Sequence, residues 1–187
     1  MKLIKRNKGI QILLGLGFAI LFVSQSSCKK TKETVDELTE FDINYTTSFI
    51  VPSTSVVVNT PADFTTPDIP TNTSSSYPNN KTAIGLIDAV KLTKFNVTAD
   101  SSNFDYLKSL TIFIQGSGLP EVQLATNTLV PTGVTSFDMS LNDVNLKDYV
   151  AKSNFKLRVN ITTDAAITVN HKMKLNQTMH VVAKILK

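Results

Sequence analysis

Residues 155–162 alternate strictly between apolar and polar side chains. The apolar positions are Phe155, Leu157, Val159 and Ile161. Because successive side chains of a β-strand point to opposite sides, this pattern predicts a strand with one face in a hydrophobic core and the other in solvent. Residues 109–115 show a similar pattern and are expected to form a central strand. Residues 166–175 repeat the pattern after a turn at residues 163–165, so we expect a hairpin with residues 155–162.

Further segments have the composition of short strands, because they are rich in β-branched and aromatic residues and are bounded by turn residues. They are residues 41–51, 55–59, 91–99, 121–125 and 134–141. The apolar phase slips between Leu92 and Phe95, which predicts a β-bulge or an element boundary at this point. The last strand is expected to run to the end of the chain, with a break near Asn176.

Two short helices are expected among these strands. Residues 83–90 have the apolar spacing of a short buried helix, and residues 145–151 place three apolar residues on one helical face. Either Asp143 or Asn145 can cap the second helix. One or two helices and roughly eight strands predict an all-β fold, namely an antiparallel β-sandwich. The pattern leaves jelly-roll and immunoglobulin-like strand orders open.

Residues 60–82 are expected to form a long loop. They contain four prolines and a run of threonine, asparagine and serine, which are residues that interrupt regular structure. Long loops inside a compact domain are often functional, so this segment is a candidate binding surface.

Residues 1–30 have the three-part pattern of an export signal. The basic head consists of Lys2, Lys5, Arg6 and Lys8. A mostly apolar run follows at residues 10–23, and small and polar residues then lead to Cys28. This order is typical of a secretory signal peptide. The apolar run is shorter than the ~20 residues that a membrane-spanning helix needs, which disfavours a retained transmembrane anchor.

Cys28 is the single cysteine of the sequence, and it directly follows Ser26 and Ser27. This ending resembles the acceptor site of bacterial lipoprotein signals, in the tolerant form found in Bacteroidota, although Gln25 stands where the usual pattern has leucine. The resemblance implies that diacylglycerol is attached to the Cys28 thiol and that residues 1–27 are then removed. Several acyl chains hold a protein firmly on a membrane. The alternative is ordinary cleavage after Ser26, which would leave Cys28 as a free thiol.

A charged segment, residues 28–40, is expected to be a flexible tether, so the domain itself would span residues 41–187. Within the domain, residues 103–114 together with residues 118–122 are similar to a pattern in small cell-envelope lipoproteins of the Bacteroidota. This resemblance implies an envelope location and a β-rich fold. Lys29 stands directly after the cysteine, where an aspartate marks inner-membrane retention in some bacteria, so we expect the outer membrane.

The charge balance argues against a nucleic-acid partner. The full chain carries a formal charge of +4, from 19 basic and 15 acidic residues. Four of the basic residues lie in residues 1–27, so the rest of the chain is balanced at 15 of each sign. A nucleic-acid-binding domain needs a clustered basic footprint, which this balance does not favour.

Few residues have the spacing of a catalytic or metal site. His171 and His180 are nine positions apart and would lie on opposite faces of one strand. Residues 100–105 are rich in side-chain oxygens but lack the glycine and final glutamate of a calcium loop, so we expect a capped turn. Gly116 and Gly118 are not followed by the lysine of a phosphate-binding loop. We therefore expect a protein that is not an enzyme and has no cofactor or metal.

Three functions fit these observations. The first is a lipid-anchored envelope module that binds an unknown protein or glycan partner, with residues 60–82 as a candidate surface. The second is a structural subunit that assembles by strand exchange through residues 41–51 or the last strand. The third is a hydrolase whose carboxylates come from distant strands.

Overall fold

The computed structural model describes residues 38–53, 57–100 and 103–186. The predicted signal peptide, Cys28 and most of the predicted tether lie outside these ranges. The strands, in chain order, are β1 (Leu38–Val51), β2 (Ala62–Thr65), β3 (Ile69–Pro70), β4 (Ile87–Ala99), β5 (Leu107–Gln115), β6 (Val122–Asn127), β7 (Ser136–Asp138), β8 (Ser140–Leu141), β9 (Asn154–Thr163) and β10 (His171–Lys184). The helical elements are α2 (Thr73–Asn79), the 3-10 helix η1 (Ile84–Leu86) and α3 (Lys147–Val150). In the described part of the chain, no helix is long and apolar enough to cross a membrane.

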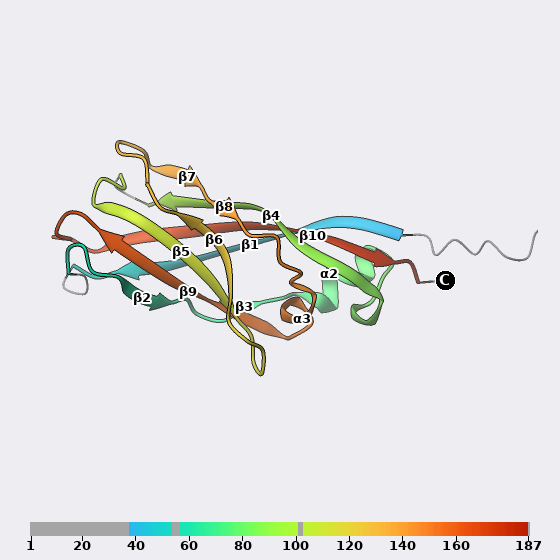
Figure 1. Cartoon of the computed structure of the whole chain (residues 1–187). Coiled ribbons are helices and arrows are strands. Elements are labelled where there is room, and N and C mark those ends of the chain that lie inside the picture. Colours follow the sequence, from blue (N-terminus) through green and yellow to red (C-terminus); the bar gives the residue numbers. More distant parts are fainter. Residues whose placement is uncertain (1–37, 54–56, 101–102, 187) are drawn as a thin grey trace, which may run out of the picture. The chain divides into compact units, whose positions relative to one another are not determined.

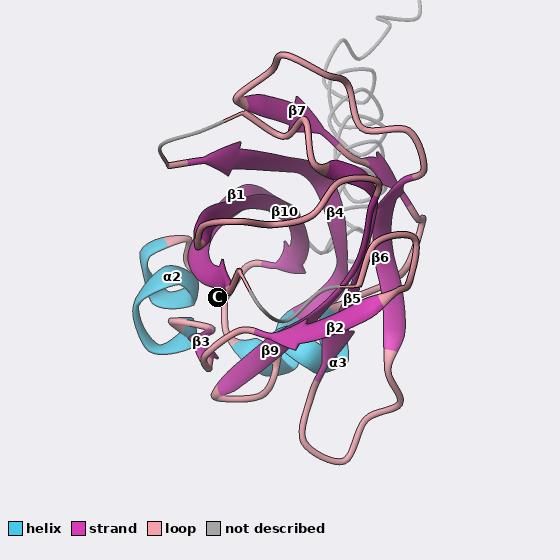
Figure 2. Ribbon diagram, turned by 90° about the vertical axis from the view of Figure 1, so that its left-hand side faces the viewer, coloured by secondary structure: helices cyan, strands magenta, loops and turns pink. Residues whose placement is uncertain are grey.

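The strands form two facing sheets (Figures 1 and 2). A four-stranded sheet has the order β1-β10-β4-β7, and a second sheet has the order β2-β9-β5-β6-β8, with β3 also paired to β9. The strand pairs of both sheets are antiparallel. Figure 2 shows α2 and β3 on one side of the sandwich, between β1 and β9. The prediction of an all-β antiparallel sandwich with short helices is confirmed.

Alternating side chains from both sheets build the core. The inward residues of β9 (Phe155, Leu157, Val159 and Ile161) are at most 1% exposed. Those of β5 (Leu110, Ile112 and Ile114) and five of β10 (Met173, Leu175, Met179, Val181 and Ala183) are fully buried. Burial of this apolar surface is the main force that holds the two sheets together.

The predicted hairpin between residues 155–162 and 166–175 is wrong. β9 pairs with β2, β3 and β5, whereas β10 lies in the opposite sheet between β1 and β4. Residues 164–170 carry the chain from one sheet to the other. Alternation shows which face of a strand is buried, but the pattern is the same in either sheet and therefore does not identify the pairing partner.

The prediction of a long loop at residues 60–82 is also wrong, because this segment contains β2, β3 and α2. Tyr77 of α2 is buried and packs edge-on against Phe41, with the ring centroids 6.0 Å apart. The hydroxyls of Thr66 and Thr71 are bonded to the backbone of β9 and of the residues just before it. The threonine hydroxyls here satisfy backbone groups of β9 and of the residues before it, instead of marking a loop.

The expected bulge is confirmed at Thr93. Leu92 pairs with Met179 and Lys94 pairs with Thr178, so Thr93 has no opposing residue in β10. The extra residue restores the apolar phase that slips at this point of the sequence.

Several predicted boundaries differ from the structure. β1 begins at Leu38, so the last residues of the predicted tether belong to the sheet. Residues 57–59 form a turn instead of the end of a strand. In residues 83–90 only η1 is helical, and β4 already begins at Ile87. The strand predicted at residues 134–141 is interrupted at Met139, because β7 pairs with β4 in one sheet and β8 with β6 in the other.

The helix predicted at residues 145–151 is confirmed as α3. Asn145 Oδ1 accepts a hydrogen bond from the Lys147 backbone N–H at its start, at 3.1 Å. Asp143 instead forms an ion pair with Lys91, with 2.8 Å between Oδ1 and Nζ.

β10 runs without the predicted break near Asn176, and this places a polar residue in the core. Gln177 is 2% exposed and lies between Tyr45 of β1 and Phe95 of β4 in the register. Neither the oxygen nor the nitrogen of its amide has a hydrogen-bond partner among the described residues. A buried amide without partners lowers the free energy of unfolding.

We therefore expect Gln177→Met to raise the free energy of unfolding by about 1–3 kcal/mol, because a side chain of similar volume then replaces an unpaired amide. Urea unfolding followed by circular dichroism measures the change. Asn176→Met, one position along on the outward face, is the control and should bring no gain. A lower stability for Gln177→Met would show that buried water satisfies the amide.

Candidate functional site

The outer face of the second sheet carries an ordered arginine. Arg158 is an outward residue of β9, and its guanidinium carbon lies 4.0 Å from the ring centroid of Phe113 on β5. The two residues are paired in the register of the strands. Arg158 points away from the core, as the alternation of residues 155–162 predicts, and its cation covers the Phe113 ring on that side of the sheet.

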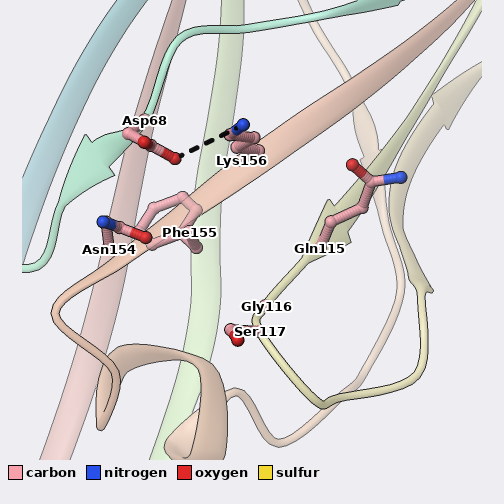
Figure 3. A pocket seen from close by; sticks show the side chains of 7 residues that line it. All are labelled: Asp68, Gln115, Gly116, Ser117, Asn154, Phe155 and Lys156. Carbon is pink, nitrogen blue, oxygen red and sulfur yellow. Dashed lines mark ion pairs between the residues drawn. The ribbon is translucent and has the colours of Figure 1, made fainter.

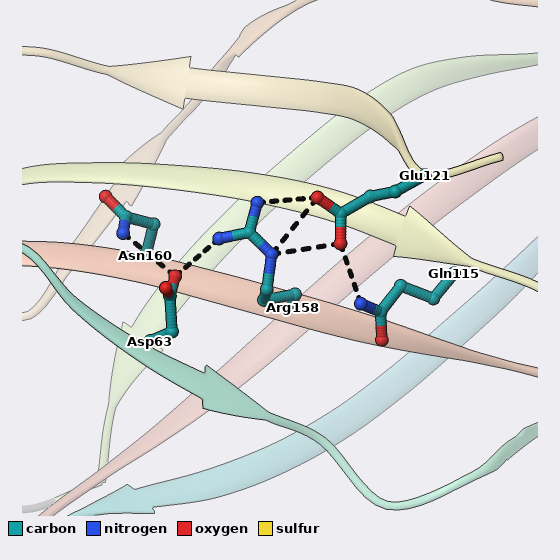
Figure 4. A network of polar contacts seen from close by, with 5 residues as sticks. All are labelled: Asp63, Gln115, Glu121, Arg158 and Asn160. Carbon is teal, nitrogen blue, oxygen red and sulfur yellow. Dashed lines mark hydrogen bonds and ion pairs between the residues drawn. The ribbon is translucent and has the colours of Figure 1, made fainter.

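Two carboxylates hold the guanidinium from opposite sides (Figure 4). Glu121 accepts hydrogen bonds from Arg158 Nε at 2.9 Å and from Nη2 at 2.6 Å, and Asp63 of β2 accepts one from Nη1. Gln115 Nε2 donates to Glu121 at 2.7 Å, and Asn160 Nδ2 donates to Asp63 at 2.9 Å. We call these five residues the Arg158 cluster. The planar fork of the guanidinium suits this two-sided contact, which fixes the geometry of the cluster.

The hydrogen bonds of the cluster keep its charges ionised. Those from Asn160 and then Arg158 lower the pKa of Asp63, and those from Arg158 and then Gln115 lower the pKa of Glu121. Contacts with Glu121 and Asp63 raise the pKa of Arg158. A glycoside hydrolase needs one carboxylic acid with a raised pKa to protonate the leaving group. Asp63 and Glu121 therefore do not suit this chemistry as a pair.

A pocket of about 300 Å³ lies on the same face and shares Gln115 with the cluster (Figure 3). It is lined by Asp68, Gln115, Gly116, Ser117, Asn154, Phe155 and Lys156. Lys156 Nζ lies 3.7 Å from Asp68 Oδ1 across it. Ser117, Asn154 and Lys156 are exposed, whereas Phe155 is almost fully buried. The lining thus combines hydrogen-bond donors and acceptors over an apolar base.

Packing against α3 fixes the turn that borders the pocket. The Tyr149 hydroxyl donates a hydrogen bond to the carbonyl oxygen of Pro120. A Cβ on Gly116 would lie 3.2 Å from the Tyr149 ring and 3.0 Å from Leu119, so the backbone approaches its neighbours closely here. Gly118, with φ of +72°, allows the tight turn between β5 and β6. Gly116 therefore lines the pocket, and Gly118 shapes the turn beside it.

The two histidines lie on opposite faces of β10, as predicted. His171 stacks on Tyr106, with the ring centroids 4.0 Å apart, and burial lowers its pKa. His180 Nδ1 lies 2.9 Å from Asp42 Oδ1, and its Nε2 lies 3.7 Å from Glu40 Oε2. Both acids come from β1, so they are distant in sequence and close only in the sheet. The structure does not bring the two histidines together into one site.

The carboxylates of residues 100–105 face separate partners. Asp100 forms ion pairs with Lys174 at 2.7 Å and with Lys172 at 3.3 Å, and the hydrogen bonds from Lys174 and then Lys172 lower the pKa of Asp100. Asp105 accepts hydrogen bonds from the Gly133 N–H and from the Asn103 amide. Residues 101–102 lie outside the described ranges. In the part of the chain that is described, no group of three or more His, Cys, Asp or Glu side chains is placed to hold a metal ion.

The sequence did not reveal the Arg158 cluster. Asp63 lies 95 positions from Arg158 and Glu121 lies 37 positions from it. The one sequence feature that points to this cluster is an arginine at an outward position of a predicted strand. The sequence alone does not identify the acidic residues that lie beside it. The candidate surface at residues 60–82 does contribute, because it supplies Asp63 to the cluster and Asp68 to the pocket.

A more apolar groove of about 370 Å³ lies at one edge of the sandwich. Phe49 and Ile50 of β1 line it together with Phe64 of β2 and Pro67. β1 and β2 each lie at one edge of their sheet, so the groove runs between two strand edges. β10 is paired on both sides. Of the two segments predicted to exchange strands, β1 is the one that lies at the edge of its sheet among the described strands.

We expect Arg158→Leu to lower the free energy of unfolding at pH 7 by about 1 kcal/mol, the scale of a largely solvent-exposed ion-pair network. The folded pKa values of Asp63 and Glu121 lie below their ordinary values of 3.8 and 4.5. Their contribution is therefore present above about pH 4.5 and is lost as the pH falls through the depressed folded values. The difference between wild type and variant should shrink between pH 7 and pH 2.5.

Urea unfolding across this pH range measures the effect, and Lys94→Leu on the other sheet is the control for loss of an exposed positive charge. A difference that stays constant with pH would mean that Arg158 stabilises the fold by covering Phe113 and not through its carboxylates.

No protein-family model matches this chain, and the search of curated proteins found no match either.

Proposed function

We propose that this protein is a lipoprotein of the bacterial cell envelope, held on the outer membrane through Cys28, that binds a polar ligand and does not catalyse a reaction. The observation that carries the binding function is the pocket beside the Arg158 cluster on the outer face of β9 and β5. The anchor is supported by the signal-like residues 1–27, the cysteine that follows them, and the start of the folded domain at Leu38.

The lining of the pocket favours a neutral, hydroxyl-rich ligand such as an oligosaccharide. Lys156 and Asn154 offer donors, while Asp68 and the amide oxygens offer acceptors, and a sugar hydroxyl uses both. Asp68 and Lys156 balance each other, and the neighbouring Arg158 cluster carries two acids against one base. This excess of negative charge disfavours an anionic ligand. A volume of about 300 Å³ lies at the small end of ligand sites.

The alternative is an interaction protein that accepts an extended strand from a partner. It is favoured by the open edge of β1 beside the apolar groove of Phe49, Ile50, Phe64 and Pro67. Backbone hydrogen bonds along such an edge give affinity, and the groove would select side chains.

The anchor is tested by the intact mass of the protein from membranes of a bacterial host. We expect a chain that begins at Cys28 and carries acyl chains, and we expect Cys28→Ser to lack this mass and to leave the membrane fraction. A wild-type chain that begins at Ser27 without lipid would contradict the anchor. It would leave the proposal about the pocket intact, because the two rest on different residues.

The ligand is tested with neutral di- and trisaccharides by saturation-transfer NMR. We expect Lys156→Ala to weaken binding about tenfold, because it removes a donor from the pocket. Lys94→Ala, an exposed lysine of the other sheet, should bind as wild type does. Equal binding by both variants would contradict the pocket. A protein that binds none of the sugars and associates with itself at high concentration would favour the strand-accepting alternative.

A further inference from the structure

The described chain enters and leaves the sandwich at the same end. Leu38 opens β1 opposite Lys184 near the end of β10, and the Leu186 N–H donates a hydrogen bond to the Lys81 carbonyl oxygen at 2.8 Å. η1 directly precedes Ile87, which pairs with Ala183 of β10. Figure 1 shows the start of β1, α2 and the C-terminus at one end of the domain. We call this the entry end.

The entry end exposes large apolar side chains. Leu38 is 53% exposed, Ile84 of η1 is 40% exposed, and Leu186 is 54% exposed. The hydrogen bonds and strand pairs above bring these three side chains, which we call the entry-end cluster, to one end of the sandwich. Charged residues near them are mixed in sign (Glu40, Lys81, Asp88 and Lys184), so apolar contact and not net charge would be the attractive force.

The length of chain before Leu38 limits how far this end can lie from the anchor. Cys28 and Leu38 are ten positions apart, and a fully extended chain spans at most ~3.5 Å per residue, or ~35 Å. A short link also keeps the local concentration of one surface high near the other. Apolar side chains held in this way at a bilayer surface partition into the boundary between headgroups and acyl chains.

We propose that the entry-end cluster of Leu38, Ile84 and Leu186 docks on the surface of the bilayer that holds the lipid anchor. The occupant of this apolar end is thus a phospholipid surface. This inference rests on the proposed anchor at Cys28. It adds a defined orientation, in which the long strands β1 and β10 lead away from the membrane and the opposite loops face outward.

The opposite end provides a matched comparison. β1 has 14 residues and at ~3.3 Å per residue spans ~45 Å. Leu129 follows β6 and is 81% exposed. The N–H of the next residue, Val130, donates a hydrogen bond to the Lys108 carbonyl oxygen at 3.1 Å, which places Leu129 close to Lys108. This position lies beside the start of β5, where Leu107 pairs with Thr163. Leu129 is thus an apolar side chain far from the entry end.

The test uses the absence of tryptophan from the sequence. Full-length lipidated Leu186→Trp, Ile84→Trp and Leu129→Trp are each placed in vesicles of phosphatidylethanolamine and phosphatidylglycerol with brominated acyl chains. Bromine quenches only those indoles that reach the acyl-chain boundary. We expect Trp fluorescence at positions 186 and 84 to be quenched at least about twofold more than at position 129. Two variants at the entry end are used so that the test still stands if one of them misfolds. Far-UV circular dichroism verifies the fold of each variant.

Equal quenching at all three positions in protein that floats with the vesicles would overturn this inference while leaving the anchor in place. A dimer in detergent, together with unquenched tryptophan at position 186 in the vesicles, would show that a second copy covers the entry end. That result would also overturn this inference and leave the anchor in place. Protein that carries no lipid and does not float would overturn the anchor and, with it, this inference.

Discussion

The pairing of the first and last strands is the constraint on which the rest of the sandwich depends. β1 and β10 are in register from Leu38 and Lys184 to Val51 and His171. β10 also pairs with β4 and is therefore an inner strand of the four-stranded sheet, so this sheet cannot form until the last strand of the described chain has paired. Such contacts close the longest loop that the domain allows, and burial of the inward side chains of β10 and of the strands beside it offsets the entropic cost of closure. The same pairing brings Leu38 and Lys184, near the two ends of the described domain, to one end of the sandwich.

The sequence predicts which face of a strand is buried better than it predicts which strand lies beside it. Alternation correctly identified the inward residues of β5 and β9, and the slip between Leu92 and Phe95 located the bulge at Thr93. These features are local and follow from the period of a strand. The hairpin failed because strands of either sheet share that period. Residues 60–82 were misread because their prolines and threonines serve short edge strands and backbone hydrogen bonds, which depend on the position of β9.

The sequence alone does not predict the candidate site, and the reason is related. Arg158 gains its role from Asp63 and Glu121, which only the order β2-β9-β5-β6 brings beside it. The outer face of the other sheet is also polar, but its side chains bond to one another: Thr178 donates to Asn44 at 2.8 Å, and Thr46 donates to Asn176 at 3.1 Å. Polar groups that already hydrogen-bond to one another gain little free energy from a bond to a ligand, whereas the side chains of Ser117 and Asn154 are exposed at the pocket. This difference favours the second sheet as the binding face.

The orientation of the domain bears directly on which ligand can reach the pocket. Lys156 lies seven positions before Thr163, and Thr163 is level with the far end of the sandwich through its pairing with Leu107. At ~3.3 Å per residue, the pocket therefore lies ~23 Å from that end, about halfway along the ~45 Å length of β1. With the entry end resting on the bilayer, the pocket would sit roughly 20 Å above the membrane and within reach of molecules attached to it. A domain that swings freely on its tether would instead sample a range of heights, so docking narrows the set of ligands that the pocket meets.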